Sequence, residues 1–149
     1  MDDIRFRPMV AAEMLAVRQL LDRQGLPTQD LDASHAEFIL ALREDKIVGG
    51  VGLERFGKAA LLRSMAVEGP LQRQGLGSML VHRALEQARA AGIADLFLLT
   101  TTAELFFAKH GFARCDRQTV PQAIAACSEF RSVCPASAVC MRLDLGKGG

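Results

Sequence analysis

Residues 72–80 read QRQGLGSML, a glycine-containing turn that leads directly into an apolar helical pattern. Glycine destabilises helices, so Gly75 and Gly77 at the mouth of this one need a physical reason. The first turn of a helix has unpaired N–H groups and partial positive charge, which suit an anion such as phosphate. Because glycine lacks a Cβ, an oxygen-rich ligand can approach its backbone. We therefore predict a pyrophosphate site here, with the side chains of residues 72–74 as further donors.

The pattern Q-x-x-G-x-G differs from the two best-known phosphate loops. A dinucleotide fingerprint needs G-x-G-x-x-G, and a nucleoside-triphosphate loop needs G-x-x-x-x-G-K-[ST]. This chain contains neither around residues 72–80. The pattern alone also fits an ordinary strand-to-helix turn, so its surroundings must decide.

Hydrophobic periodicity and turn residues predict the elements around this turn. In chain order we expect a strand at 4–8, a helix within 11–27, strands at 36–43, 46–56 and 59–67, a helix at about 75–91, a strand at 93–100, a short helix at 103–112, a helix at about 121–130 and a strand at 137–145. The three middle strands form an antiparallel meander. The sequence therefore predicts a mixed α/β sheet flanked by helices.

Composition limits the class of protein. The 149 residues are 50% hydrophobic, with 18 basic and 17 acidic side chains and a net charge of +1. We predict a single domain at 1–145 with a disordered tail at 146–149. The balanced charge argues against a nucleic-acid partner or a polybasic membrane contact. No apolar run is long enough for a membrane span, and MDDIRFRP at the N-terminus does not resemble a signal peptide, so we expect a cytoplasmic protein.

Four cysteines lie late in the chain, at positions 115, 127, 134 and 140. None forms the Cys-x-x-Cys pair of zinc or redox motifs, so we predict reduced thiols and no metal site. A soft-metal or arsenite site built from Cys127, Cys134 and Cys140 is the alternative. Buried cysteine usually acts as a small hydrophobic residue, which favours the first interpretation.

Two motifs together resemble the GNAT superfamily of N-acetyltransferases. Its signature is Q/R-x-x-G-x-G/A after a strand that ends in an apolar Ala-Val pair, and the second match is LFLLTTTAELFFAKHGF at 96–112. The resemblance runs from IRFRP to MRLDL. LLTTTAELFFAKHGF and EFRSVCPASAVCM are further similar to a subfamily found with arsenic-resistance genes and to amino-acid N-acetyltransferases that acylate glutamate.

The resemblance implies the GNAT acyl-CoA acyltransferase fold, a mixed twisted sheet whose central strands splay apart between RSMAV and LFLLT. It implies acetyl-CoA as cosubstrate, with the pantetheine arm paired to strand backbone and the pyrophosphate on residues 72–78. The implied cofactor-binding residues are Met65, Ala66, Val67, Gln72, Arg73, Gln74, Gly75, Leu76, Gly77, Ser78, Thr101 and Phe106.

The catalytic residues follow the family pattern only in part. Many members use a tyrosine as acid where this chain has Phe107, and this chain contains no tyrosine. Glutamate-acetylating relatives use a hydroxyl at the end of the second central strand, which matches Thr100, although a strand-end threonine can instead bond to backbone. Their general base matches Leu61 here, so we predict Glu54 as base, with a solvated strand-end glutamate as the alternative.

Two arginines are candidates for binding the acceptor. Arg63 lies in an apolar strand and needs an anionic partner. Arg131 with Ser132 resembles a pair that holds the acceptor's carboxylate in the glutamate-type enzymes. Either arginine can instead serve in a structural ion pair. The histidines are expected on the surface, in loops or on the long helix.

These features predict an acetyl-CoA-dependent N-acetyltransferase that acts on a small amine, such as a free amino acid or an analogue, with a link to arsenic or xenobiotic resistance. The alternatives are a protein or peptide acetyltransferase, an acetyl-CoA-binding sensor without turnover, and an arsenite-binding protein. Dimers are common in the superfamily, so a homodimer is compatible with the resemblance.

Overall fold

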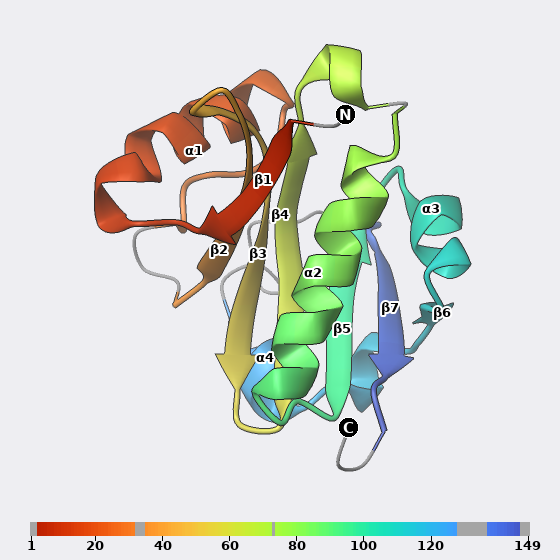
Figure 1. The fold of residues 1–149 in the computed structure, drawn as a ribbon. Helices are drawn as coiled ribbons and strands as arrows, with labels where there is room; N and C mark the ends of the chain where they lie inside the picture. Colours follow the sequence, from red (N-terminus) through yellow and green to blue (C-terminus); the bar gives the residue numbers. More distant parts are fainter. Residues whose placement is uncertain (1–2, 32–34, 73, 128–136, 147–149) are drawn as a thin grey trace.

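The computed structural model describes residues 3–31, 35–72, 74–127 and 137–146. Its helices and strands follow the predicted order (Figure 1). They are β1 (Ile4–Pro8), α1 (Met14–Arg23), β2 (Glu37–Arg43), β3 (Lys46–Phe56), β4 (Ala59–Val67), α2 (Leu76–Ala90), β5 (Asp95–Thr100), α3 (Glu104–Lys109), β6 (Ala113–Arg114), α4 (Gln122–Ala125) and β7 (Val139–Asp144).

The seven strands form one mixed sheet in the order β1-β2-β3-β4-β5-β7-β6. The strands β2, β3 and β4 are the predicted antiparallel meander, and β1 extends it by pairing antiparallel with β2. Its first tight turn places Glu44 and Asp45 at φ values of 50° and 66°, as the right-handed twist of a two-residue hairpin favours. The predicted mixed α/β fold is confirmed.

The central strands β4 and β5 are parallel and separate after a short paired stretch. Their register runs only from Ala59↔Asp95 to Leu61↔Phe97. Beyond that point β5 continues along β7, as far as Thr100↔Val139. The second half of β4 therefore has no strand partner on its β5 side within the described chain, which is the predicted splay.

A β-bulge accompanies this separation. The β3–β4 register shifts between Gly50 and Gly52, and Ser64 on β4 adopts a φ of 55°. A non-glycine residue in the left-handed region is uncommon, and such residues gather at functional sites. Bulges bend the strand that carries them, so this one belongs with the divergence of β4 from β5.

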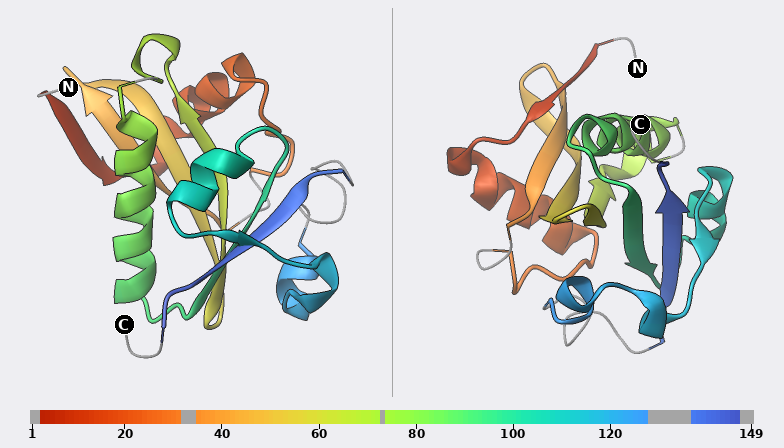
Figure 2. Two further views of the ribbon diagram at one scale, coloured as in Figure 1. Left: turned by 90° about the vertical axis from the view of Figure 1, so that its right-hand side faces the viewer. Right: turned by 90° about the horizontal axis from the view of Figure 1, so that it is seen from below.

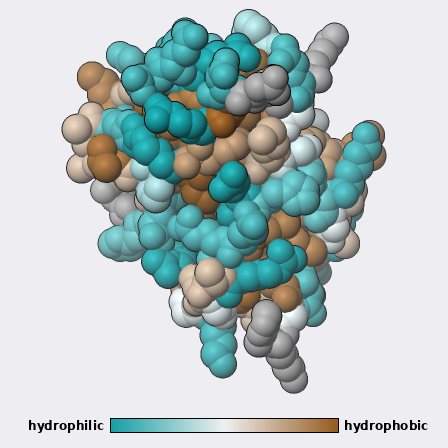
Figure 3. Space-filling model, in the orientation of Figure 1, coloured by the Kyte–Doolittle hydropathy of each residue, from teal (hydrophilic) through white to brown (hydrophobic). Residues whose placement is uncertain are grey.

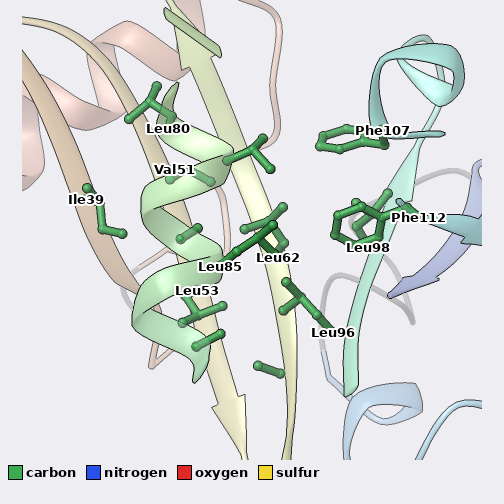
Figure 4. Close-up of a cluster of buried hydrophobic side chains, with 14 of the residues drawn as sticks. Ile39, Val51, Leu53, Leu62, Leu80, Leu85, Leu96, Leu98, Phe107 and Phe112 are labelled. Atoms are coloured by element: carbon green, nitrogen blue, oxygen red, sulfur yellow. The ribbon is translucent and has the colours of Figure 1, made fainter. Parts of the chain in front are cut away.

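Helices cover both faces of the sheet, with α2 on one side and α1 and α4 on the other (Figure 2, left). The predicted inner stripe of α2 is buried: Leu76, Leu80, Ala84 and Ala88 are fully covered. Figure 4 shows the apolar cluster that this helix makes with the sheet and with Phe107 and Phe112. This packing fixes the N-terminus of α2 beside the end of β4.

Some boundaries differ from the sequence prediction. The predicted helix within 11–27 begins with a 3₁₀ turn at Ala11–Glu13, and its α-helical part ends at Arg23. The predicted helix at 121–130 is described only as Gln122–Ala125, and residues 128–136 lie outside the described residues. The two-residue β6 was not predicted, because so short a strand carries no periodicity.

The described helices include none that is long and apolar enough to cross a bilayer. The face over α2 is largely hydrophilic with smaller hydrophobic areas between (Figure 3). At the predicted tail, Gly146 donates its N–H to the Asp144 side chain at 2.7 Å, and 147–149 lie outside the described residues.

Candidate functional site

A cleft of about 430 Å³ lies where β4 and β5 separate. Its walls come from the second half of β4, the end of β5 with the loop that follows, α3, and the loop after α1. The lining residues are Gly25, Leu26, Pro27, Leu62, Arg63, Ser64, Met65, Leu98, Leu99, Thr100, Thr101, Thr102, Ala103, Phe107 and Ala138. The cleft therefore joins an unpaired strand edge to a hydroxyl-rich loop.

The N-terminus of α2 lies next to the end of β4 and has no side-chain cap in the described part of the chain. Gly75 is its N-cap, with a φ of 85°. A Cβ on Gly75 would meet nothing within 4 Å, so the need for glycine there is conformational rather than steric. The positive φ adds a backbone reason for glycine at this position, and the expectation that Gly75 also makes room for a ligand stays a prediction.

Gly77 has a different role. A Cβ placed there would meet Phe106 Cζ at 3.5 Å and Met65 Cε at 3.8 Å, which are ordinary contacts. The protein's own packing does not exclude a side chain at this position. Access for a ligand to the helix backbone at Gly77 stays a prediction.

The two glutamines of the turn bond to the protein. Gln72 Nε2 donates to Gln24 Oε1 at 2.7 Å and to the Val67 carbonyl at 3.0 Å. Gln74 Nε2 donates to the Pro70 carbonyl at 3.2 Å. Both amides therefore hold the turn in place in this structure, and the predicted donation to a ligand would require them to exchange partners. Arg73 lies outside the described residues.

Ser78 in the first turn of α2 contacts His110, which follows α3. The Ser78 Oγ and His110 Nε2 atoms are 3.1 Å apart, and the Phe106 ring packs against the imidazole. Desolvation, and secondarily the nearby His82, lower the pKa of His110. His110 is half-buried rather than a free surface residue. Its position at the end of α3, before Gly111 and Phe112, gave no sign that it would reach α2.

Thr100 combines the two alternatives left open by the sequence. Its Oγ1 accepts a hydrogen bond from the Ala103 N–H at 3.0 Å, and the residue also lines the cleft. A hydroxyl that accepts one bond still has its own hydrogen to donate. The chemistry of a donor at this end of the cleft is therefore compatible with the backbone bond.

Arg63 is held by two carboxylates. Its guanidinium makes a bidentate pair with Asp30 at 2.7 and 2.6 Å, and Nη1 lies 3.3 Å from Glu54 Oε1. The Arg63 side chain is 1% exposed. The need for an anionic partner is met, and this geometry favours the structural ion pair over contact with an acceptor.

Asp30 was not recognised in the sequence. It is 6% exposed, in a loop far from Arg63 along the chain. A single aspartate in a polar loop carries no pattern that distinguishes it from solvent-exposed neighbours. The sequence indicated the ion pair only through its other partner, because Arg63 lies within an apolar strand.

Glu54 is 5% exposed, which excludes the solvated strand-end alternative. Its carboxylate touches Arg63 and is not among the groups that line the cleft. Leu61, the position at which the resemblance implies a base, is fully buried. Arg131 and Ser132 lie outside the described residues.

The described residues contain no group of three His, Cys, Asp or Glu side chains placed to hold a metal ion. Cys134, one member of the alternative arsenite site, lies outside them. Cys115 and Cys140 lie close together, with Sγ atoms 3.2 Å apart.

A family profile for the acetyltransferase (GNAT) domain matches residues 34–114, more than half of the chain. This chain belongs to the GNAT acetyltransferase family. The matched span covers the meander, the glycine turn with α2, the cleft strand β5 and α3.

Named relatives are amino-acid acetyltransferases. The one from Shewanella oneidensis is 29% identical over 108 residues, which cover 68% of this chain and 24% of the relative. The structure is similar to N-acetylglutamate synthase from Neisseria gonorrhoeae complexed with coenzyme A and N-acetyl-glutamate, with a TM-score of 0.81, 20% identity and coverage of 97% of this chain and 35% of that one. This chain thus spans about a quarter to a third of these relatives.

A third match is of the same size as this chain. Rv2747 from Mycobacterium tuberculosis, solved in complex with CoA, aligns with a TM-score of 0.77 and 24% identity, over 94% of this chain and 98% of that one. At this identity the likeness establishes the fold.

Proposed function

We propose that this chain is an N-acetyltransferase that transfers acetyl from acetyl-CoA directly to the amino group of a small molecule such as a free amino acid. The observation that carries the proposal is the cleft between β4 and β5. One of its lining residues, Met65, lies near Gly77 in the first turn of α2, where the described residues provide no side-chain cap. Solved GNAT proteins with this fold carry CoA in their complexes.

The residues of this cleft and of the first turn of α2 fit coenzyme A. An unpaired β4 edge beyond Leu61 offers backbone donors and acceptors to the amides of a pantetheine arm. The first-turn N–H groups of α2, from Leu76 to Ser78, suit a pyrophosphate. Phe106 packs beside this turn as an apolar wall. Bound acetyl-CoA would supply an acetyl group activated as a thioester.

The chain's own groups would then orient the acetyl group and protonate the leaving CoA thiolate. The bulge at Ser64 leaves β4 backbone groups facing the cleft, and we assign them to hold the acetyl carbonyl and the pantetheine. The Thr100 hydroxyl can donate its hydrogen at the thiol end of the cleft. It would serve where other family members use a tyrosine.

Thr100 is tested with two substitutions. Thr100→Val removes the hydroxyl and should lower kcat by at least about tenfold, while Thr100→Ser keeps it and should retain most of the activity. Unfolding curves of both variants separate the loss of the Ala103 bond from the loss of chemistry. Equal kcat in the valine and serine variants would remove Thr100 from the mechanism.

Glu54 remains the proposed proton acceptor for the amine; because its carboxylate contacts Arg63 and does not line the cleft, it would act through an intervening water. Glu54→Gln leaves the bidentate Arg63–Asp30 pair in place, so the fold should persist. We expect kcat to fall and the acidic limb of its pH profile to disappear, at an unchanged dissociation constant for CoA. A lower kcat with the same pH profile would instead make Glu54 a structural residue.

The acceptor class rests on the named relatives, which are amino-acid acetyltransferases. An amino acid carries a carboxylate, and we assign Arg131 with Ser132 to bind it, since Arg63 is committed to Asp30 and Glu54. Arg131→Gln should raise the KM for the amino acid by roughly tenfold or more, because a charged hydrogen bond is lost, without changing CoA binding. An unchanged KM would exclude Arg131 from the acceptor site.

The function is tested by the release of free CoA from acetyl-CoA across amino acids, their phosphinic and arsenical analogues, small amines and peptides. Turnover with a free amino acid supports the proposal. Turnover with peptides alone would indicate a protein acetyltransferase, and tight acetyl-CoA binding without turnover would indicate a sensor domain. The cytoplasmic location, the homodimer and the absence of a nucleic-acid partner remain predictions.

A further inference from the structure

We propose that Cys115 and Cys140 form a reversible dithiol–disulfide site between β6 and β7. Cys115 directly follows β6, whose register with β7 continues to place it opposite Cys140. The Cys115 N–H donates to the Cys140 carbonyl at 2.9 Å, and the two Sγ atoms are 3.2 Å apart. The two thiols therefore already lie next to each other, beside the hydrogen bond that joins the two backbones.

This geometry fits a disulfide without a change of fold. Residues opposite one another in an antiparallel pair have Cα atoms about 4.5–5.5 Å apart, and disulfides span about 4.4–6.8 Å. An S–S bond of about 2.05 Å requires the sulfur atoms to approach by roughly 1 Å. Rotation of two side chains supplies that movement.

The two thiols are not equivalent. Cys115 is half-buried, whereas Cys140 is 4% exposed, in an apolar cluster with Leu61, Phe97 and Ile124. Desolvation, and then the bond to Cys115, raise the pKa of Cys140 to about 12. A small oxidant therefore reaches Cys115 first, and Cys140 resolves the adduct.

The proposed oxidant is a low-molecular-weight disulfide. The Cys115 thiolate attacks one sulfur of the reagent, the reagent's S–S bond breaks, and one thiolate leaves and takes up a proton. The Cys140 thiol then loses its proton to solvent and attacks Cys115 Sγ, which expels the second thiolate. Two protein thiols are oxidised by two electrons, and one disulfide is reduced to two thiols.

The location ties this site to the cleft. Cys140 lies opposite Leu99 on β5, one register pair away from Thr100↔Val139. The chain between the two cysteines, 116–139, includes α4. A disulfide would join both ends of this segment at one point of the sheet.

The test uses the full chain, incubated with glutathione disulfide, alkylated and mapped by peptide mass spectrometry. We expect a mass loss of two hydrogens, a Cys115–Cys140 linked peptide, and recovery of both thiols with dithiothreitol. Closing the loop between them should raise Tm by roughly 5–10 °C. A lasting glutathione adduct on Cys115, a link to another cysteine, or no reaction at Cys115 would each overturn the proposal.

Single substitutions separate the attack of Cys115 on the oxidant from the attack of Cys140 on the adduct. Cys140→Ala, which keeps a small apolar group in the core, should accumulate the glutathione adduct on Cys115. Cys115→Ser should leave Cys140 unmodified, because it is buried. Cys127→Ser and Cys134→Ser serve as matched controls and should form the link at the wild-type rate. Loss of the link in either control would place the reactive pair elsewhere.

Discussion

Glycine at position 75 has a conformational cause, whereas at position 77 we propose that glycine leaves room for a ligand. Gly75 has a φ of 85°, and an L-residue in the left-handed region costs roughly 1–2 kcal/mol. Gly75→Ala should therefore lower the free energy of unfolding by about that amount, measured in urea. This substitution tests the backbone conformation and is matched with Gly77→Ala, which tests the access of a ligand.

Gly77→Ala is the other half. Its Cβ makes ordinary contacts with Phe106 and Met65, and alanine favours helix over glycine, so stability should be unchanged or slightly raised. CoA binding should nevertheless weaken, because the methyl group occupies the approach to the helix backbone. Wild-type affinity in Gly77→Ala would show that no ligand approaches this turn.

His110 provides a pH-dependent probe of the same turn. Desolvation and His82 lower its pKa, so the folded state favours the neutral imidazole. Its contribution to stability is therefore full above the ordinary value of about 6.5 and is lost as the pH falls through the folded pKa. The ring signals of His110 in an NMR titration should move at lower pH than that ordinary value.

The His82→Gln variant checks the second cause. Removing the neighbouring charge should shift the pKa of His110 upward, toward the ordinary value, because the repulsion between two imidazolium ions is gone. An unchanged titration would mean that burial alone sets the pKa.

At the scale of elements, the buried charge cluster joins β4, β3 and the loop after α1. Arg63→Met leaves Asp30 and Glu54 buried without their counter-charge, and breaking such a pair costs roughly 3–5 kcal/mol. The exposed pair Arg55–Glu37, also anchored on β3, is the matched control: Arg55→Met should cost less than about 1 kcal/mol.

Urea unfolding of both variants measures the contrast. Similar small decreases in the free energy of unfolding of Arg63→Met and Arg55→Met would mean that water reaches Asp30 and Glu54 once Arg63 is replaced. The cluster would then be a minor contributor to the attachment of the α1 loop to the sheet.

The sequence predicted the elements whose pattern is local. The alternation of the meander, the inner stripe of α2 and the apolar run of β5 each identify a strand or helix without any distant partner. Two-residue β6 and the partner of Arg63 depend on chain segments that meet only in the fold. The spacing of residues along the sequence does not predict contacts between such distant segments.

The candidate site shows the same division. The glycine turn and Thr100 could be proposed as site residues from the sequence, because the motifs that resemble the family are contiguous there; both stay predictions. The contact of Ser78 with His110 and the commitment of Gln72 to Gln24 are tertiary contacts and were not predictable. For Glu54 the sequence left a desolvated base and a solvated strand-end glutamate open, and both its burial and its contact with Arg63 required the structure.

At the scale of the whole molecule, one sheet is divided into two halves that share only the Ala59–Leu61 stretch of β4 with β5. The β1–β4 meander carries one wall of the cleft, and β5 with β7 carries the other. Because α2 packs along the sheet with its N-terminus beside the end of β4, the fold brings the proposed anion site to the open edge. Binding of CoA there is the central claim.

Amide NMR of the labelled chain titrated with CoA tests that claim most directly. We predict that the largest shifts fall on the amides of Leu76, Gly77 and Ser78 and on those of Met65 and Ala66. The structure also offers a separate hollow of about 210 Å³ between β1 and α2, lined by Phe6, Arg7 and Arg83 among others. Shifts confined to that hollow, or no shifts at saturating CoA, would contradict the proposed cofactor path and the function built on it.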